Sequence, residues 1–186
     1  MSKYEKRGAY HWRDFSNRRS TYHKYVAALL GWVKTGSNDR VLDIGAGDGL
    51  IASKLKGQVV GIDADETAVR LAQERGINVT LGDACSLPYP DASFDTVFCG
   101  DTIEHLDNPH KAIEEMQRVL RMGGALYLTT SPPDEKRKPN PEHYKEYSAD
   151  ELQQLVRAQN FTACGAVFDR HVRLHAKFIS FCCGKD

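Results

Sequence analysis

The chain has 186 residues, with 25 Lys and Arg against 25 Asp and Glu, and its sequence pI is near 7.0. A chain of this length buries about 70% of the surface that it exposes when unfolded, so one core suffices without disulfide bonds. Balanced charge argues against binding nucleic acid or an anionic membrane through bulk electrostatics, which requires excess positive charge. No run of 18 apolar residues is present and the first residues lack the apolar core of a signal peptide, so we expect one cytoplasmic domain.

The first predicted element is a helix that ends near Gly36. Residues 1–19 are polar, basic and aromatic and show no periodicity. After them, apolar side chains recur with the spacing of one helical face. The residues of this stripe are Tyr22, Tyr25, Val26, Leu29, Leu30 and Val33.

From residue 40 onward, predicted strands alternate with predicted helices. The strands are 40–44, 58–62, 78–81, 94–99 and 125–130, and the helices are 49–56, 66–75, one that Asn108–Pro109 begins and Gly123–Gly124 ends, and one that begins at the capping box of Ser148 and Glu151. Two final β-rich runs, 161–168 and 174–182, have no helix between them and should form an antiparallel pair. This alternation predicts an α/β fold with a mostly parallel sheet that helices cover on both faces.

Residues 131–147 form the longest predicted loop. They contain four prolines and the basic run Lys136-Arg137-Lys138, and they are too polar to be buried. The loop follows the carboxyl end of a strand, where substrate loops lie in such folds.

The five cysteines indicate reduced thiols rather than a disulfide framework or a zinc site. Their number is odd, two are adjacent, and none has Cys-x-x-Cys spacing. A free cysteine usually packs as a small hydrophobe.

A glycine-rich turn follows the first predicted strand. Gly45, Gly47 and Gly49 have G-x-G-x-G spacing, which lets the backbone approach a ligand and turn without a Cβ in the way. A dinucleotide site has G-x-G-x-x-G spacing and binds a pyrophosphate. Asp43 and Asp48 would repel a pyrophosphate, so the turn favours a ligand with positive charge and disfavours a nicotinamide cofactor.

Two further acids follow the next two predicted strands. Asp63 comes 18 residues after Gly45, where a carboxylate can accept both hydroxyls of a ribose. Asp83 follows the third strand. Three acids at three consecutive strand ends indicate a ligand site rather than a solvated surface.

Together these motifs resemble the class I S-adenosylmethionine-dependent methyltransferases, and within them the small-molecule type 11 subgroup that includes ubiquinone-pathway enzymes. The matching segments are 41–49, Asp63, Asp83–Ala84, 94–106 and 118–126. The resemblance spans about residues 39–160. It implies one domain, 1–186, with a three-layer Rossmann-like fold and a seven-stranded, mostly parallel sheet whose last strand is antiparallel. Residues 1–36 would be an N-terminal lid and helix, and 39–186 the catalytic core.

The resemblance also implies which residues bind S-adenosylmethionine, with S-adenosylhomocysteine as product. Asp63 would hold the ribose hydroxyls, Asp83 the adenine amino group, Gly45 and Gly47 the methionine end, and Gly100 or Asp101 the methionine ammonium. The backbone N–H of Ala84 would bind an adenine ring nitrogen. The full implied set is Asp43, Gly45, Ala46, Gly47, Asp63, Ala64, Asp83, Ala84, Gly100 and Asp101.

Three residues are candidates for the methyl-transfer step itself. His105 is a plausible general base because its ordinary pKa lies near neutrality. Glu104 and His143 are the other two, and the alternative is that Glu104 and His105 only orient loops and cofactor. In some relatives a similar set looks like a divalent-metal site, here Asp101, Glu104, His105 and His143; we treat a metal as the minority interpretation.

The leading functional hypothesis is methyl transfer to a small-molecule acceptor, with no membrane or nucleic-acid partner. One alternative is metal-assisted ribose 2′-O-methylation of RNA, which the basic run at 136–138 would favour and the zero net charge disfavours. Another is a catalytically silent S-adenosylmethionine-binding module. The acceptor, its reacting atom and the oligomeric state are not encoded in any motif of this sequence.

Overall fold

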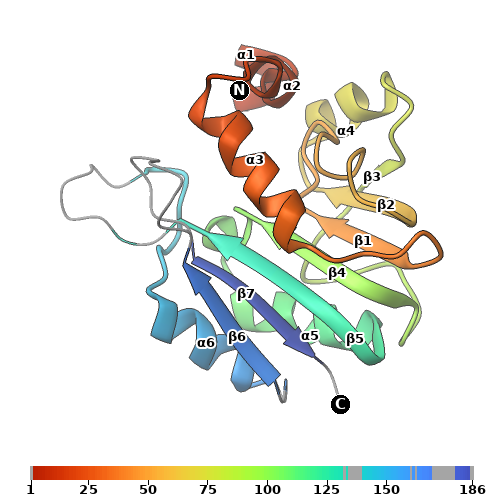
Figure 1. Cartoon of the computed structure of the whole chain (residues 1–186), viewed down its shortest axis with the longest axis vertical. Helices are drawn as coiled ribbons and strands as arrows, with labels where there is room; N and C mark the ends of the chain where they lie inside the picture. The colour runs from red at the N-terminus through yellow and green to blue at the C-terminus, as the bar shows by residue number, and fades with distance from the viewer. Residues whose placement is uncertain are drawn as a thin grey trace.

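One twisted sheet organises the molecule (Figure 1). The computed structural model describes residues 2–131, 133, 140–159 and 161, together with the backbone of 163–168 and 179–184. Its elements are α1 (Lys3–Arg7), α2 (Tyr10–Ser16), α3 (Thr21–Trp32), β1 (Arg40–Ile44), β2 (Gln58–Asp63), α4 (Glu66–Gln73), β3 (Val79–Leu81), β4 (Phe94–Gly100), the 3₁₀ helix η1 (Ile103–His105), α5 (Pro109–Val119), β5 (Leu120–Thr130), α6 (Ala149–Arg157), β6 (Ala163–Phe168) and β7 (Ile179–Gly184).

Five strands form a parallel sheet in the order β3-β2-β1-β4-β5. β1 lies in the middle, where Val41 pairs with Val59 of β2 on one side and with Thr96 of β4 on the other. β7 and β6 extend this sheet beyond β5 through antiparallel ladders. The predicted Rossmann-like α/β fold with a parallel sheet is confirmed. From β1 the chain adds β2 and β3 on one side of the sheet and then β4 and β5 on the other, so the topological switch point lies between β1 and β4. Folds of this kind bind their ligands at the switch point.

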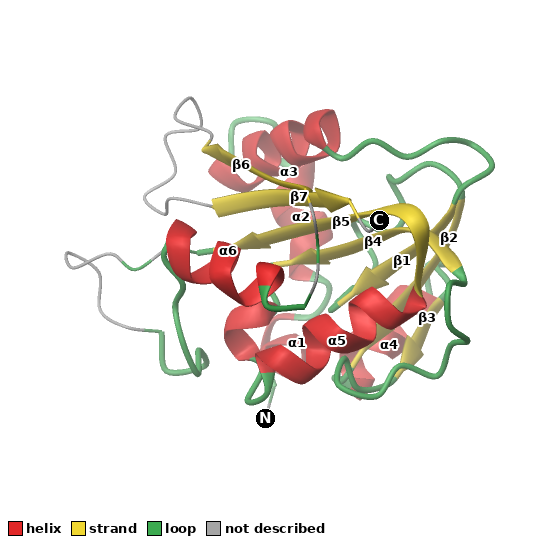
Figure 2. Cartoon of the chain, turned by 90° about the horizontal axis from the view of Figure 1, so that it is seen from below, coloured by secondary structure: helices red, strands yellow, loops and turns green. Residues whose placement is uncertain are grey.

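Helices cover both faces of the sheet (Figure 2). Side chains alternate along each strand, so neighbouring residues face opposite layers. Val97 and Leu126 belong to the larger core, which α5 and α6 complete. Phe98 and Tyr127 point the other way and pack against α3. On the parallel edge, α4 packs against β3. Among the described residues, no helix is both long and apolar enough to cross a membrane.

The predicted helix at 49–56 is wrong, because residues 47–54 form a series of turns. Gly49 has φ +79°, which a right-handed helix does not allow. A Cβ at this position would lie 2.9 Å from Cγ2 of Ile77. Beyond Gly49, hydrogen bonds of four-residue spacing (Ser53 to Gly49, Leu55 to Ile51) are mixed with one of three-residue spacing (Lys54 to Ile51), so turns form instead of a regular helix.

The predicted end of α5 at Gly123–Gly124 is also wrong. α5 ends at Val119, and β5 begins at Leu120, which already pairs with Phe94. The ladder shifts register between Phe94 and Thr96, and Gly123 has φ +70°. The glycine pair therefore shapes an irregular stretch of strand instead of ending the helix.

Two short helices, α1 and α2, lie in the N-terminal segment for which no periodicity is visible in the sequence. Ser2 and Glu5 form a capping box at the start of α1. Tyr4 and Tyr10 are buried together against Ala68 of α4. The N-terminal segment is thus packed on the body of the fold, beside α3 (Figure 1).

Candidate active site

A cavity of about 440 Å³ lies at the carboxyl ends of β1, β2, β3 and β4. Nine of the ten residues expected to bind the cofactor line it, and Gly47 is the tenth. The nine are Asp43, Gly45, Ala46, Asp63, Ala64, Asp83, Ala84, Gly100 and Asp101. Residues from α1 and α3 close the cavity on the opposite side, including Lys3, Tyr4, Tyr22 and Tyr25.

The glycine-rich turn is held in the left-handed backbone region. Gly45 has φ +70° and Gly47 has φ +57°. A Cβ on Gly45 would lie 2.1 Å from Oγ1 of Thr102, and a Cβ on Gly47 would lie 2.1 Å from the hydroxyl of Tyr4. Both positions therefore require glycine for space as well as for conformation. Gly47 faces α1.

Asp63 fixes this turn to the end of β2. One carboxylate oxygen accepts the backbone N–H of Gly47 at 2.7 Å, and the other accepts that of Asp65 at 2.9 Å. Burial raises the pKa of Asp63, and these two N–H donors oppose the rise. Each carboxylate oxygen has a further lone pair, so Asp63 can still accept hydroxyl groups from a ligand.

Asp43 and Asp101 each have one buried carboxylate oxygen that accepts no hydrogen bond from the described residues. These atoms are Oδ2 of Asp43 and Oδ1 of Asp101. Burial, reinforced by the charge of Asp63, raises the pKa of Asp43 to about 8. Burial, reinforced by Glu104, raises the pKa of Asp101 to about 7. A cation with several N–H donors would satisfy both oxygens and offset the cost of burying two carboxylates.

Asp101 has an unusual backbone as well. Its φ is +50°, a conformation that residues other than glycine rarely adopt. Its Oδ2 accepts a hydrogen bond of 2.9 Å from the hydroxyl of Tyr25 on α3. The side chain is therefore positioned by a helix that is distant in sequence.

Asp48 does not line the cavity, although the sequence suggested that it faces the ligand. It is fully buried, and its carboxylate accepts the backbone N–H of His11 and contacts Nδ1 of the same residue, both at 3.1 Å. The indole N–H of Trp12 donates to the Asp48 carbonyl at 2.9 Å. Asp48 therefore holds α2 against the glycine-rich turn.

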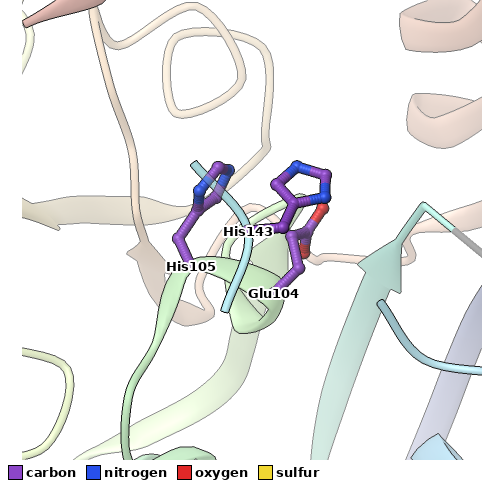
Figure 3. Close-up of side chains that lie close together, drawn as sticks. All are labelled: Glu104, His105 and His143. Carbon is purple, nitrogen blue, oxygen red and sulfur yellow. The ribbon is translucent and has the colours of Figure 1, made fainter. Parts of the chain in front are cut away.

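The three candidate catalytic residues lie together, and among them His105 lines the cavity (Figure 3). The rings of His105 and His143 meet edge to face with centroids 4.8 Å apart. Nδ1 of His105 lies 2.9 Å from the carbonyl oxygen of Glu142. A carbonyl can only accept, so Nδ1 carries the proton and Nε2 has a free lone pair. Burial lowers the pKa of His105, which favours this neutral form.

Glu104 and His143 make the contacts that hold the segment of Glu142 next to His105. Glu104 is 1% exposed, its Oε2 accepts from the hydroxyl of Thr130 at 2.8 Å, and its backbone carbonyl accepts from Tyr144 N–H at 2.8 Å. His143 contacts Glu146 through Nδ1 at 3.2 Å and Asn140 through Nε2 at 2.9 Å. These contacts fix the segment that carries Glu142 beside His105.

Comparison with known proteins agrees with this geometry. Residues 42–128 match the family model Methyltransf_11, a methyltransferase domain. Over 154 residues the chain is 37% identical to the uncharacterized methyltransferase YcgJ of Bacillus subtilis, covering 72% of this chain and 61% of that protein. Over 127 residues it is 38% identical to a probable S-adenosylmethionine-dependent methyltransferase of Mycobacterium tuberculosis, covering 62% of this chain and 46% of that protein. The chain belongs to the class I S-adenosylmethionine-dependent methyltransferases of type 11.

A solved structure shows the same fold over nearly the whole chain. It is a methyltransferase from Thermotoga maritima, described as a possible histamine N-methyltransferase. It has a TM-score of 0.78 and 26% sequence identity, and the alignment covers 98% of each chain. The family resemblance inferred from the glycine-rich turn and the strand-end acids is thereby confirmed, with S-adenosylmethionine as cofactor. The chain spans less than two thirds of the length of the two curated relatives named above.

Potential metal ligands in this methyltransferase come from three of the four residues proposed from the sequence. Donor atoms of Glu104, His105 and His143 lie within 4.8 Å of one another, and Asp101 is outside this group. Both ring nitrogens of His143 already contact protein groups. To hold a metal, His143 would have to give up its contact with either Asn140 or Glu146, since an imidazole nitrogen that binds an ion cannot also take part in a hydrogen bond.

Sequence reasoning missed several residues that shape the cavity. Tyr25 belongs to the apolar stripe of α3, yet it lines the cavity. Tyr4 and Lys3 lie in a segment that carries no periodic signal. Glu142 lies in the long predicted loop, where nothing local marks it. The basic run at 136–138 lies outside the described residues.

Proposed function

We propose that this methyltransferase transfers the methyl group of S-adenosylmethionine to a small-molecule acceptor that binds beside His105. The observation that carries the proposal is the pair of buried carboxylate oxygens that accept no hydrogen bond from the described residues, on Asp43 and Asp101, two residues that line a cavity at the switch point of the sheet. The cofactor, when bound, supplies an electrophilic methyl group on a sulfonium. The chain's own task is then to hold, orient and deprotonate the acceptor.

The cofactor would lie along the strand ends. Asp63, at the end of β2, is placed to hold the ribose hydroxyls, and Asp83 and Ala84, after β3, would hold the adenine. The methionine end would lie over Gly45 and Gly100, with its ammonium shared between Asp43 and Asp101. This orientation places both unpartnered carboxylate oxygens near positive charge.

His105 is the proposed general base. Its Nε2 lone pair is free because the carbonyl of Glu142 fixes the proton on Nδ1. The lowered pKa keeps the ring neutral and able to accept a proton from a hydroxyl or an ammonium. Glu104 and His143 act as positioning residues, since they fix the loop that carries Glu142.

The N-terminal segment 1–36 is proposed to serve as a lid, within a single domain that has its catalytic core at 39–186. Tyr4 and the pair of His11 and Asp48 fasten it to the glycine-rich turn. A lid of this kind would exclude water from the sulfonium and complete the acceptor site. A cavity bounded in this way suits a small acceptor, and the Thermotoga relative, described as a possible histamine N-methyltransferase, also points to one.

The test is a screen of small amines, alcohols, phenols and carboxylic acids for S-adenosylhomocysteine release. With an identified acceptor, His105→Asn should lower kcat by about 10²- to 10⁴-fold and leave the Kd for S-adenosylhomocysteine within about twofold. A variant that keeps full kcat would contradict the assignment of His105 as base.

Metal-assisted ribose methylation of RNA is the second candidate, favoured by the cluster of Glu104, His105 and His143. It predicts that exhaustive chelation abolishes activity and that RNA binds with a salt-sensitive affinity. Activity on a small acceptor that survives chelation would exclude it.

A further inference from the structure

A lysine, Lys3, lines the cavity together with several acids. Six carboxylates line it: Asp43, Asp63, Asp65, Asp83, Asp101 and Glu142. Lys3 is the one lysine or arginine among the described residues that do so. It comes from α1, which lies on the opposite side of the cavity from the strand ends.

The position of Lys3 is set by the residues on either side of it. Ser2 and Glu5 close a capping box, in which the Glu5 N–H donates to Oγ of Ser2 at 3.2 Å. Tyr4 is 5% exposed, and its hydroxyl lies in the space that a Cβ on Gly47 would fill. Lys3, next to Tyr4 in the chain, is half-buried and lines the cavity, with its Nζ 5.9 Å from the centroid of the Tyr4 ring.

The cofactor is a zwitterion at its methionine end, with an ammonium and a carboxylate on the same carbon. Asp43 and Asp101 provide acceptors for the ammonium. The carboxylate of the same group would bring a further negative charge into a cavity lined by six acids, which costs free energy unless a cation lies nearby. Lys3 supplies that cation.

We propose that Lys3 binds the carboxylate of the cofactor's methionine moiety, so that docking of α1 depends on the amino-acid part of the cofactor. The proposal rests on the function proposed above and assigns a binding residue to the same site. In this arrangement, α1 would dock more firmly when a ligand with the methionine carboxylate is bound.

The reach of the Lys3 charge agrees with this placement. The pKa of Asp101 is raised first by burial and then by Glu104, and Lys3 is among the groups that oppose the rise. Lys3 likewise opposes the rise in the pKa of Asp63, which burial dominates. Lys3 therefore lies near enough to the ends of both β2 and β4 to act on their carboxylates, in agreement with its place in the cavity lining.

The experiment compares two ligands by titration calorimetry at low salt. S-adenosylhomocysteine carries the carboxylate, and 5′-methylthioadenosine lacks the whole amino-acid moiety. Lys3→Met should weaken S-adenosylhomocysteine binding about tenfold and change 5′-methylthioadenosine binding less than about twofold. Lys3→Arg should restore most of the affinity. Lys6→Met, an exposed lysine of the same helix, is the matched control and should change neither ligand.

Three outcomes overturn the inference: unchanged S-adenosylhomocysteine affinity in Lys3→Met, equal losses for both ligands, or an equal loss in Lys6→Met. The first would also be the result if Lys3 binds an anionic group of the acceptor instead. Thermal unfolding of each variant shows whether the fold is retained. If the wild-type chain binds neither ligand, the proposed function fails; if it binds both and Lys3→Met behaves like wild type, only the role of Lys3 fails.

Discussion

The neighbouring ends of β1 and β4 carry similar side chains that different parts of the molecule hold in place. Each has a carboxylate with one buried oxygen that accepts no hydrogen bond from the described part of the chain, Asp43 on β1 and Asp101 just after β4. Asp43 lies within a regular strand that is paired on both sides. Asp101 lies beyond its strand, in a left-handed backbone conformation, and accepts a hydrogen bond from Tyr25 of α3.

We call the β1 end with the glycine-rich turn the prebuilt half of the site, and the β4 end with His105 the assembled half. The β1 end is determined by the sheet and the glycine-rich turn, so it should persist without the N-terminal segment. The β4 end requires α3, and His105 beyond it requires the loop that carries Glu142. Cofactor recognition and acceptor recognition should therefore respond differently to mutation.

The largest effect is expected where the two halves meet, at Gly45. In Gly45→Ala the new Cβ would clash with the stiff, β-branched side chain of Thr102. The alanine would also have to adopt the positive φ of this position. We expect at least a hundredfold loss of affinity for S-adenosylhomocysteine and a loss of about 2–4 kcal/mol in the free energy of unfolding.

Gly76→Ala is the matched control for this change. Its φ is +72°, but nothing lies within 4 Å of the added Cβ. It should therefore show the backbone strain alone, about 1 kcal/mol, with normal cofactor affinity measured by calorimetry. If the two variants lose the same affinity, the contact between Gly45 and Thr102 has no role in the site.

Asp43→Asn should lower cofactor affinity about tenfold at pH 8.5, by removing a charge that faces the ammonium. The effect should shrink toward pH 6, because wild-type Asp43 has a pKa of about 8 and is then protonated. Calorimetry across this range tests it, and Asp107→Asn, an exposed acid outside the cavity lining, is the control. A tenfold loss that does not vary with pH would rule out titration of Asp43 as the cause.

The same variant changes how stability depends on pH. The pKa of Asp43 is raised from 3.8 in the unfolded chain to about 8 in the fold, so the fold favours the protonated form. Its contribution to stability is complete below about pH 4 and is lost as the pH rises to about 8. Thermal unfolding without ligand should show a decline over this range that is smaller in Asp43→Asn. A decline of equal size in both proteins would contradict the assigned pKa.

The smallest expected effect on affinity is that of Tyr25→Phe, which removes the hydroxyl that donates to Asp101 Oδ2 at 2.9 Å and lies 3.1 Å from Oγ1 of Thr129. We expect about a fivefold loss of cofactor affinity, with little change in the unfolding temperature. Tyr89→Phe, a tyrosine that packs against Phe94 away from the cavity lining, should change neither quantity. Normal affinity in Tyr25→Phe would show that the β4 end is as independent of α3 as the β1 end.

The sequence predicts that the residues of the prebuilt half lie together, and the structure places them in one cavity, because their signals are local. Gly45, Asp63 and Ala84 each follow a strand whose apolar pattern is clear, and strand ends in a parallel sheet meet at one edge. The same local reasoning gives the wrong result at 49–56, where Gly49 has a positive φ and the residues after it form turns.

The assembled half is less accessible to sequence reasoning. Tyr25 follows the periodicity of an ordinary core residue, and its hydroxyl finds Asp101 only after α3 docks on the sheet. His143 is 38 positions from His105, in a segment without regular structure. Asp48 lies in the turn where a ligand contact was expected, but its carboxylate instead accepts a hydrogen bond from His11 of α2. Tertiary packing, which local patterns do not contain, decides all three.

Titration of the purified chain with S-adenosylmethionine tests the central claim most directly. We expect saturable binding to the wild-type protein, at least a tenfold loss in Asp63→Ala, and no binding of NAD, since the cavity presents acids where a pyrophosphate would lie. Failure of wild-type protein to bind S-adenosylmethionine at millimolar concentration, or unchanged affinity in Asp63→Ala, would contradict the claim that the acid-lined strand ends form the cofactor site.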